Sequence, residues 1–464
     1  MMRKAPYNNG IFITVCVILF FVVSCKIGEK YTRPELNLPE QLVEDRIDSL
    51  SFADINWWEL YTDSVLQGII QTALENNKDI LIATSRLKQY WAAKQIATVQ
   101  LFPQADAVVH GEREMQHYDG EEREVSPEYA LIANVGWELD LWGNIRWGRE
   151  ASMADYLATV EAKRAVELSL IAEVAELYFN LIALDDELSI VKKTIDSRKE
   201  GLRIANLRFK GGLTSETSVQ QAQVELANTV PLKPDLERSI RAIENQLALL
   251  MGAYNNKIER GIGLADQNPP ENLPIGLSSF LLNRRPDIRE AEQQLIAANA
   301  MVGVAVTNRF PRISLTAEIG TENDDLESLL SSPFWFVAGD ILTPIFAAGK
   351  LKNQQKRAEA IYEEEIYAYQ KTVLNAFHET NAAIITIEKA KEITIAHRNR
   401  VRAASEYKRL AEIQYLNGAI GYLDLLDSQR SLLDAEISLN NAKRDELIAL
   451  VQLYKSLGGG WQAK

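Results

Sequence analysis

The sequence has few cysteines and lacks an apolar run long enough to form a membrane-spanning helix. Its 464 residues include two cysteines, Cys16 and Cys25, and both lie close to the N-terminus. The longest apolar run covers residues 11–23, whereas a helix needs about 20 apolar residues to cross a bilayer. These absences exclude a disulfide-rich secreted domain and a polytopic helical membrane protein.

Motifs of enzymes and cofactor sites are also missing. The four histidines form no His-Glu-x-x-His pair, no Gly-x-Ser-x-Gly occurs, and Ala348-Gly349-Lys350 lacks the upstream glycine of a P-loop. The net charge of −14 disfavours nucleic acid as a partner. We therefore expect no enzyme activity, no cofactor and no metal site.

The N-terminus has the layout of an export signal. Arg3 and Lys4 precede the apolar run, and Val22-Val23-Ser24-Cys25 resembles a bacterial lipobox. We expect a signal peptide over 1–24, acylation of Cys25, and an extended strap over 25–62 that follows the lipid anchor. Lys26, next to the cysteine, favours the outer membrane. The alternative is an ordinary signal peptide that contains a cysteine.

Two segments predict exceptionally long helices. Residues 144–209 contain no proline and two glycines, and residues 350–417 contain neither glycine nor proline. A helix of this length extends on the order of 100 Å and must run beside other long helices. Apolar residues recur along both segments at coiled-coil spacing, and Arg198 alone interrupts the seam between Leu188 and Phe209.

The remaining sequence predicts shorter helices and strands. Residues 133–141 and 312–320 alternate between apolar and polar side chains, which is typical of two-faced strands. A charged loop is expected around residues 121–127, and Pro231 and Pro234 should kink or interrupt the helix that contains them. The other expected segments are helices at 63–76, 78–101 and 215–251 and strands at 104–113 and 129–142.

The second half of the chain repeats the first. Phe102-Pro103 recurs as Phe310-Pro311, a shift of 208, and Gly212 and Gly252 recur as Gly418 and Gly458, a shift of 206. The fold class expected is therefore mainly α with a transmembrane β portion, built from a tandem-duplicated unit of helix, two strands, long helix and helix. We expect repeats at 63–253 and 277–458, a linker at 254–276 and a tail at 459–464.

Four strands of about ten residues have the length of transmembrane strands, but four cannot close a barrel. Oligomerisation must complete it, so we expect a membrane pore. Two alternatives are a soluble α+β fold and a lipid-anchored periplasmic coiled-coil scaffold without a pore. The alternating strands favour the pore, because a scaffold needs no strands of membrane-spanning length.

Several motifs in this order resemble the TolC/OprM family of outer membrane efflux proteins, in its lipoprotein (NodT-type) branch. They include Trp57-Trp58-Glu59-Leu60, Leu139-Asp140-Leu141-Trp142-Gly143, Arg208-Phe209 with Gly212, and Tyr415 with Gly418 before Leu423-Asp424-Leu425-Leu426-Asp427. The resemblance implies a homotrimer with a 12-stranded β-barrel continuous with a 12-helix α-barrel. It also implies a periplasmic adaptor and an inner-membrane pump of the resistance-nodulation-division type. The function expected is an exit duct for drugs or other small toxic compounds.

The two turns between paired long helices are the first candidate site. They form the expected periplasmic tip that contacts the adaptor, although helix capping alone would explain their glycines. The tip residues are Gly211, Gly212, Leu213, Gly418 and Ala419.

An acidic pair beyond the second turn is the other candidate. Asp424 and Asp427 project from one face of a first helical turn, where the helix dipole alone would favour them. The resemblance implies a ring of these acids at a closed, cation-selective aperture, with Tyr415 holding it shut. Ile420 and Ser218 stand at turn positions where some family members carry arginine and aspartate.

Overall fold

The computed structural model describes residues 26–36, 52–116, 124–254, 257–267 and 278–459. Cys25 and the expected signal peptide lie outside these residues, as do 460–464 of the expected tail. The chain forms two compact units. The first contains the described residues within 1–35, 86–160 and 290–370, and the second those within 36–85, 161–289 and 371–464. Each unit draws on both expected repeats.

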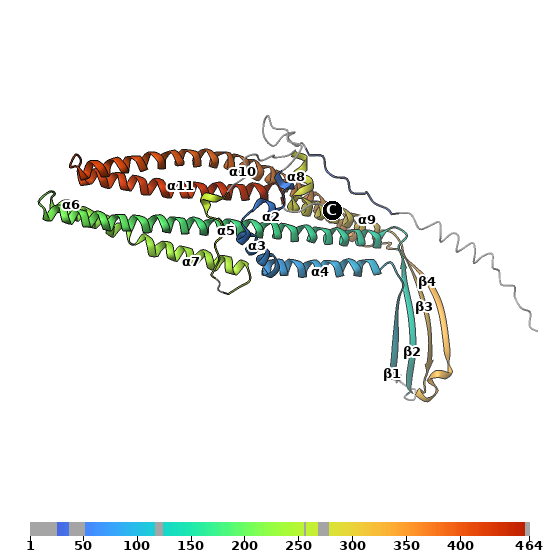
Figure 1. Ribbon diagram of the computed structural model, residues 1–464. Helices are drawn as coiled ribbons and strands as arrows, with labels where there is room; N and C mark the ends of the chain where they lie inside the picture. The colour runs from blue at the N-terminus through green and yellow to red at the C-terminus, as the bar shows by residue number, and fades with distance from the viewer. Residues whose placement is uncertain (1–25, 37–51, 117–123, 255–256, 268–277, 460–464) are drawn as a thin grey trace, which may run out of the picture. The chain divides into compact units, whose positions relative to one another are not determined.

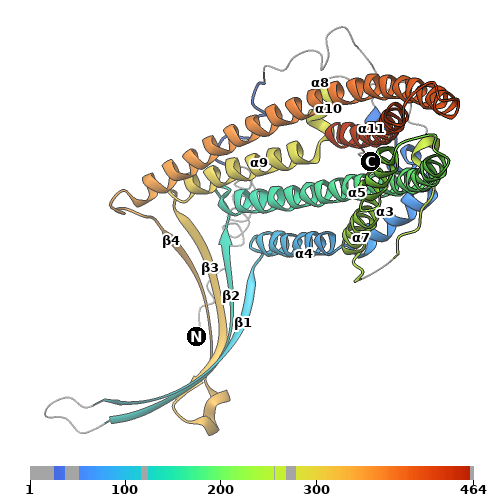
Figure 2. The same cartoon turned by 90° about the vertical axis from the view of Figure 1, so that its left-hand side faces the viewer.

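The first unit contains a four-stranded antiparallel sheet with strand order β1-β2-β3-β4 (Figure 2). The sheet confirms the strands predicted from the alternating segments. Within the described residues β1 pairs only with β2 and β4 only with β3, so each outer strand leaves one edge unpaired. The strands are β1 (Gln104–Gln116), β2 (Glu124–Leu139), β3 (Arg312–Asn323) and β4 (Pro333–Leu342).

The predicted end of the loop at residue 127 is wrong, because β2 already begins at Glu124. Pro127 therefore lies inside a strand, opposite Arg113 of β1. The pairing of β2 with β3 begins only at Tyr129, so Pro127 has a partner strand on one side alone. Proline has no backbone N–H group, and it is tolerated there because the side of β2 without a partner strand needs no hydrogen bond.

The other end of β2 was also predicted wrongly, since the strand ends at Leu139 and not at Trp142. Asp140 explains the early end. Its carboxylate oxygens accept the backbone N–H groups of Ile145 and Arg146, each at 3.0 Å, and so cap the start of the next helix.

The two longest helices confirm the prediction from the missing glycine and proline. They are α5 (Asn144–Lys210) and α10 (Lys350–Leu416), each of 67 residues (Figure 1). The other helices are α2 (Trp57–Leu60), α3 (Ser64–Asn76), α4 (Lys78–Val99), α6 (Glu216–Thr229), α7 (Leu232–Leu250), α8 (Ser278–Arg284), α9 (Pro286–Thr307) and α11 (Tyr422–Ser456). Short 3-10 turns lie at Phe52–Asp54, Leu264–Asp266 and Leu326–Ser331. None of the described helices is both long and apolar enough to cross a membrane.

The two prolines near residue 232 have different effects. Pro231 separates α6 from α7, as predicted, whereas Pro234 lies in the first turn of α7 without interrupting it. A first-turn residue has no partner for its N–H group inside the helix, so proline loses nothing there.

The segment from 25 to 62 is only partly extended. Residues 26–36 carry no helix or strand, but Phe52–Asp54 and α2 are helical turns. Burial explains the difference, because Phe52 packs edge-on against Tyr454 at 5.7 Å and Trp57 is buried. Apolar side chains in a polar segment were the signal for this contact.

Residues 26–36 pack on helices of the first unit. The Lys26 ammonium lies 3.1 Å from the ring centroid of Trp147 and pairs with Glu150, while Trp147 Nε1 donates to the Ile27 carbonyl at 2.7 Å. Trp147 is fully buried, and a Cβ on Gly303 would lie only 2.4 Å from its ring. The strap and α9 therefore enclose one aromatic side chain at the start of α5.

The second unit contains two equivalent helix contacts, one in each repeat predicted from the sequence shift. We call each contact a joint: the residue before one helix binds the end of another. Asn77, before α4, donates to the Leu250 carbonyl at the end of α7, and Arg285, before α9, donates to the Ser456 carbonyl at the end of α11, both at 3.0 Å. Gly252 and Gly458 follow these helix ends with φ of +71° and +72°. The two joints correspond residue by residue although their side chains differ.

Candidate functional site

The turn between α5 and α6 contains the first predicted tip residues. The Leu213 N–H donates to the Arg208 carbonyl at 2.8 Å, and the Gly212 N–H donates to the Phe209 carbonyl at 2.9 Å. These are the two hydrogen bonds of a Schellman helix end, and Gly212 supplies its positive φ of +71°. Gly211 precedes it and donates to the Leu207 carbonyl.

The turn between α10 and α11 has the same geometry. The Ala419 N–H donates to the Gln414 carbonyl at 2.8 Å, and the Gly418 N–H donates to the Tyr415 carbonyl at 3.1 Å. Gly418 has a φ of +74°. Helix capping thus accounts for the glycines of both turns, and contact with an adaptor stays a prediction. Leu213 is 70% exposed, so an apolar side chain is available for contact at the first turn.

Beneath the turns lies an apolar core that joins four helices. Tyr415 and Tyr422 pack with ring centroids 5.4 Å apart, and the Arg208 guanidinium lies 4.9 Å from the Tyr415 ring. The core also contains Ala205, Val219, Ala222, Ala411, Leu425 and Leu426, with Ile420 packed against it. Ile420 therefore contributes packing at a position where some family members carry a charge.

Tyr415 lies inside this core and is only 5% exposed. Its hydroxyl is buried and has no hydrogen-bond partner among the described residues. Burial raises the pKa of Tyr415, and it raises the pKa of the neighbouring Tyr422 to about 12. Both phenols are therefore neutral at physiological pH.

A small cavity borders these tyrosines. It has a volume of about 190 Å³, and its walls come from α5, α10 and α11. Gly201, Ile204, Tyr415, Tyr422 and Leu425 are among its lining residues.

Asp424 and Asp427 lie on one face of the first turns of α11, and both are exposed. Asp424 Oδ2 accepts the Gly421 N–H at 3.0 Å, which is a helix-capping contact. Asp427 Oδ2 accepts the Tyr407 hydroxyl at 3.1 Å and so raises the pKa of that tyrosine. The structure therefore gives each acid a local partner, while both carboxylates remain open to solvent.

Behind the turns lies a buried ionic network that the sequence reading missed. Arg198 Nη1 is 3.3 Å from Glu225 Oε2 and also donates to the Glu225 carbonyl at 2.8 Å and to Thr229 Oγ1. Arg430 of α11 pairs with the other Glu225 oxygen, and this hydrogen bond holds the pKa of Glu225 below its ordinary value. The interruption of the apolar seam at Arg198 was the available signal, since a buried cation requires a buried partner.

A family model described as outer membrane efflux protein matches residues 69–253 and 277–459. The solvent efflux pump outer membrane protein SrpC of Pseudomonas putida is 34% identical over 410 residues, 87% of this chain and 87% of its own length. The cation efflux system protein CusC of Escherichia coli O157:H7 is 29% identical over 461 residues, 96% of this chain and 99% of its own length. The open state of the MtrE outer membrane channel of Neisseria gonorrhoeae has a TM-score of 0.86 at 31% identity and covers 94% of this chain and 98% of its own.

Proposed function

Because the chain belongs to the outer membrane efflux protein family and is an exit duct for efflux, we propose that it works as a homotrimer in a three-part pump. The other two parts are a periplasmic adaptor and an inner-membrane pump of the resistance-nodulation-division type. The cargo is a class of drugs or other small toxic compounds. The two reported relatives are named for solvents and for cations, so the fold itself does not select the cargo.

The single observation that carries assembly into a closed ring is that, among the described residues, the outer edges of β1 and β4 are unpaired. An open edge in lipid leaves backbone N–H and C=O groups without partners, at a cost of several kcal/mol each. Pairing β4 of one copy with β1 of the next removes every edge when the ring closes. Three copies of this four-stranded sheet make the 12-stranded barrel expected from the family.

Exposed side chains on β4 fit this membrane placement. Trp335, Val337 and Ile341 alternate along the strand and therefore share one face of the sheet. All three are exposed in the isolated chain. An outward apolar band of this kind is what a strand presents to lipid.

The N-terminal segment supports a second attachment to the membrane, through an acylated Cys25. Lys26, the next residue, is held against Trp147 and Glu150 near the start of α5. Several acyl chains anchor a protein firmly, since each buried CH₂ contributes about 0.8 kcal/mol. Mass spectrometry of the mature N-terminus should find the acyl groups, and an unmodified N-terminus would contradict the anchor.

At the opposite end of α5 and α10, we assign adaptor contact to the two Schellman turns and aperture control to Asp424, Asp427 and Tyr415. The exposed Leu213 supports the first assignment. The acidic pair supports the second, because three copies would place six carboxylates around one opening and attract cations. The buried Tyr415 hydroxyl is then part of the packing that holds α10 against α11.

Deletion of the gene tests the proposed function. The mutant strain should become susceptible to a subset of a broad panel of toxic compounds, and expression of the wild-type chain should restore resistance. Crosslinking in the periplasm should recover an adaptor and a pump with the chain. An unchanged susceptibility profile together with no recovered adaptor would contradict the proposal.

A further inference from the structure

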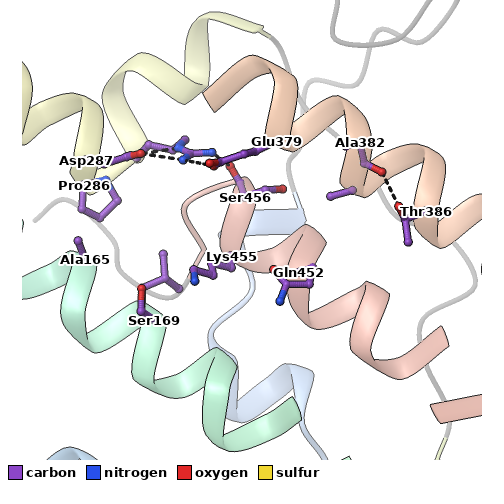
Figure 3. Close-up of a pocket in the computed structure, with 13 residues that line it drawn as sticks. Ala165, Ser169, Pro286, Asp287, Glu379, Ala382, Thr386, Gln452, Lys455 and Ser456 are labelled. Atoms are coloured by element: carbon purple, nitrogen blue, oxygen red, sulfur yellow. Dashed lines mark hydrogen bonds and ion pairs between the residues drawn. The ribbon is translucent and has the colours of Figure 1, made fainter. Parts of the chain in front are cut away.

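The joint at the start of α9 shows how the second repeat meets the first inside one copy. Arg285 is buried and lies between two carboxylates, with Nη2 2.7 Å from Asp287 Oδ2 and 2.6 Å from Glu379 Oε2 (Figure 3). Ala165 and Ser169 of α5 face this group across a cavity of about 510 Å³. Inside one copy, therefore, α5 of the first repeat covers the acidic joint of the second.

The first repeat contains the same joint without its cation. The positions equivalent to Arg285 and Asp287, 208 residues earlier, are Asn77 and Asp79. The position equivalent to Glu379, 206 residues earlier, is Glu173. Asn77, Asp79 and Glu173 line a second cavity, of about 370 Å³, together with Leu250 at the end of α7. Neither Asp79 nor Glu173 forms an ion pair with any described residue. Two carboxylates thus share one cavity where the second repeat has an arginine.

The repeat relation also shows which segment should cover this joint. The residues of α5 that cover the second joint, Ala165 and Leu168, become Lys371 and Leu374 of α10 under the same shift. Leu168 is 8% exposed, whereas Leu374 is 61% exposed. Leu249 of α7, which precedes the cavity-lining Leu250, is 72% exposed. Both partners of the missing contact are therefore present and uncovered in one chain.

We infer that α10 of a neighbouring copy docks on the first-repeat joint, with its Lys371 between Asp79 and Glu173 and its Leu374 against Leu249. This inference rests on the trimer proposed above. The ammonium of Lys371 replaces the guanidinium of Arg285, and it comes from the covering helix instead of from the joint itself. The cation therefore belongs to the joint itself within a copy and to the covering helix between copies. If α10 covered the second joint instead, Lys371 would face Arg285, so this mispairing is disfavoured.

Cysteine crosslinking tests the contact. Leu249→Cys and Leu374→Cys are combined in one chain, whose own cysteines are Cys16 and Cys25, and a short bis-maleimide is added to outer membranes. Denaturing gels should show covalent dimers and trimers. Each single variant, and the pair Leu249→Cys with Leu416→Cys, should remain monomeric on the gel. Leu416 is as exposed as Leu374 but lies 42 residues further along α10, about 60 Å away.

Charge exchange is the second arm. Lys371→Glu should lower the ratio of trimer to monomer in mild detergent by about tenfold, since three acids then share one cavity. Adding Asp79→Lys to Lys371→Glu should restore most of the ratio, whereas Arg402→Glu, on an exposed part of α10, should leave it unchanged.

The outcomes separate this inference from the proposed function. If the wild-type chain forms trimers, but the Leu249→Cys/Leu374→Cys variant gives no crosslink and Lys371→Glu leaves the trimer ratio unchanged, the docking contact is overturned and the duct is left intact. A wild-type chain that is monomeric in the outer membrane overturns the proposed trimer and the docking contact together.

Discussion

Buried charges near the tip link helices that are far apart in sequence. Glu225 contacts Arg198, 27 residues away, and Arg430, 205 residues away, and both Glu225 and Arg198 are almost fully buried. Removing one partner of a buried pair leaves the other charge without compensation, which costs about 3–5 kcal/mol. Loss of one partner from this network should therefore destabilise the fold far more than loss of one partner from an exposed ion pair along α5.

Glu225→Gln should thus lower the unfolding temperature of the helices strongly. Glu200→Gln is the matched control, because Glu200 pairs with Arg203 on the exposed surface of α5, where solvent screens the interaction and a lost pair costs little. Circular dichroism in mild detergent measures both. Equal shifts for the two variants would contradict the buried network.

Acid should reveal the same network. Because the folded-state pKa of Glu225 lies below its ordinary value of 4.5, its contribution is complete above that pH and is lost as the pH falls through the folded-state pKa. The wild-type unfolding temperature should therefore decrease below about pH 4.5. In Glu225→Gln this acid-dependent decrease should be smaller, and an identical pH profile would argue against the assignment.

Substitution of the exposed acids Asp424 and Asp427 should change ion conduction more than stability. Wild-type trimers in planar bilayers should show a small, cation-selective conductance that multivalent cations block. Asp424→Ala combined with Asp427→Ala should remove the block, and the loss of the Asp424 cap should cost only about 1 kcal/mol of stability. If the double variant keeps wild-type selectivity and block, these acids only cap and orient α11.

Individual side-chain contacts were the least predictable level of the structure. The sequence placed Asp424 and Asp427 on one face of a helix, but it could not show that Asp427 accepts the Tyr407 hydroxyl. It marked Arg198 as an interruption without showing its partners. Such contacts depend on how helices from distant parts of the chain pack, which local periodicity does not encode.

Helices and turns were predicted better, because their limits depend on local chemistry. The ends of α5 and α10 follow from where glycine and proline reappear, and Pro231 ends α6 as expected. Besides Pro234 and the helical turns within 25–62, the errors occurred at β2, where Pro127 is tolerated in a strand with one partner and Asp140 caps a helix. At Pro127 the missing partner strand on one side removed the usual cost of proline, and at Asp140 a local cap ended the strand early.

The four helix-ending glycines should differ in how they tolerate a side chain. A Cβ on Gly418 would meet no atom within 4 Å, whereas one on Gly458 would lie 3.1 Å from the backbone of Arg284 and Arg285. Gly418→Ala should cost about 1–2 kcal/mol, the strain of a positive φ. Gly458→Ala should cost about 1–3 kcal/mol more, because the joint before α9 must move. Similar unfolding temperatures for the two variants would contradict the close approach.

The tip should be sensitive to charge rather than to size if it contacts an adaptor. Leu213→Glu and Ala419→Glu should each abolish efflux in a resistance assay while the trimer still assembles, because both turns lie outside the apolar core. Leu213→Met and Ala419→Ser are the matched conservative changes and should retain efflux. Normal resistance in both glutamate variants would exclude adaptor contact at these turns.

For the assembled protein, the main prediction is closure of an open sheet by copies of the same chain. The lengths and alternation of the strands already indicated it from the sequence, and the unpaired edges of β1 and β4 support it. The number of copies comes from the family resemblance and not from any local feature. The duplication adds a constraint, since both joints must be covered, one by α5 of the same chain and one by α10 of the next.

Electron cryo-microscopy of the protein extracted from the outer membrane tests ring closure most directly. The particle should have threefold symmetry, with β4 of each copy paired to β1 of the next and twelve strands around a single tunnel. A monomeric particle, or a ring in which β1 and β4 remain unpaired, would contradict it.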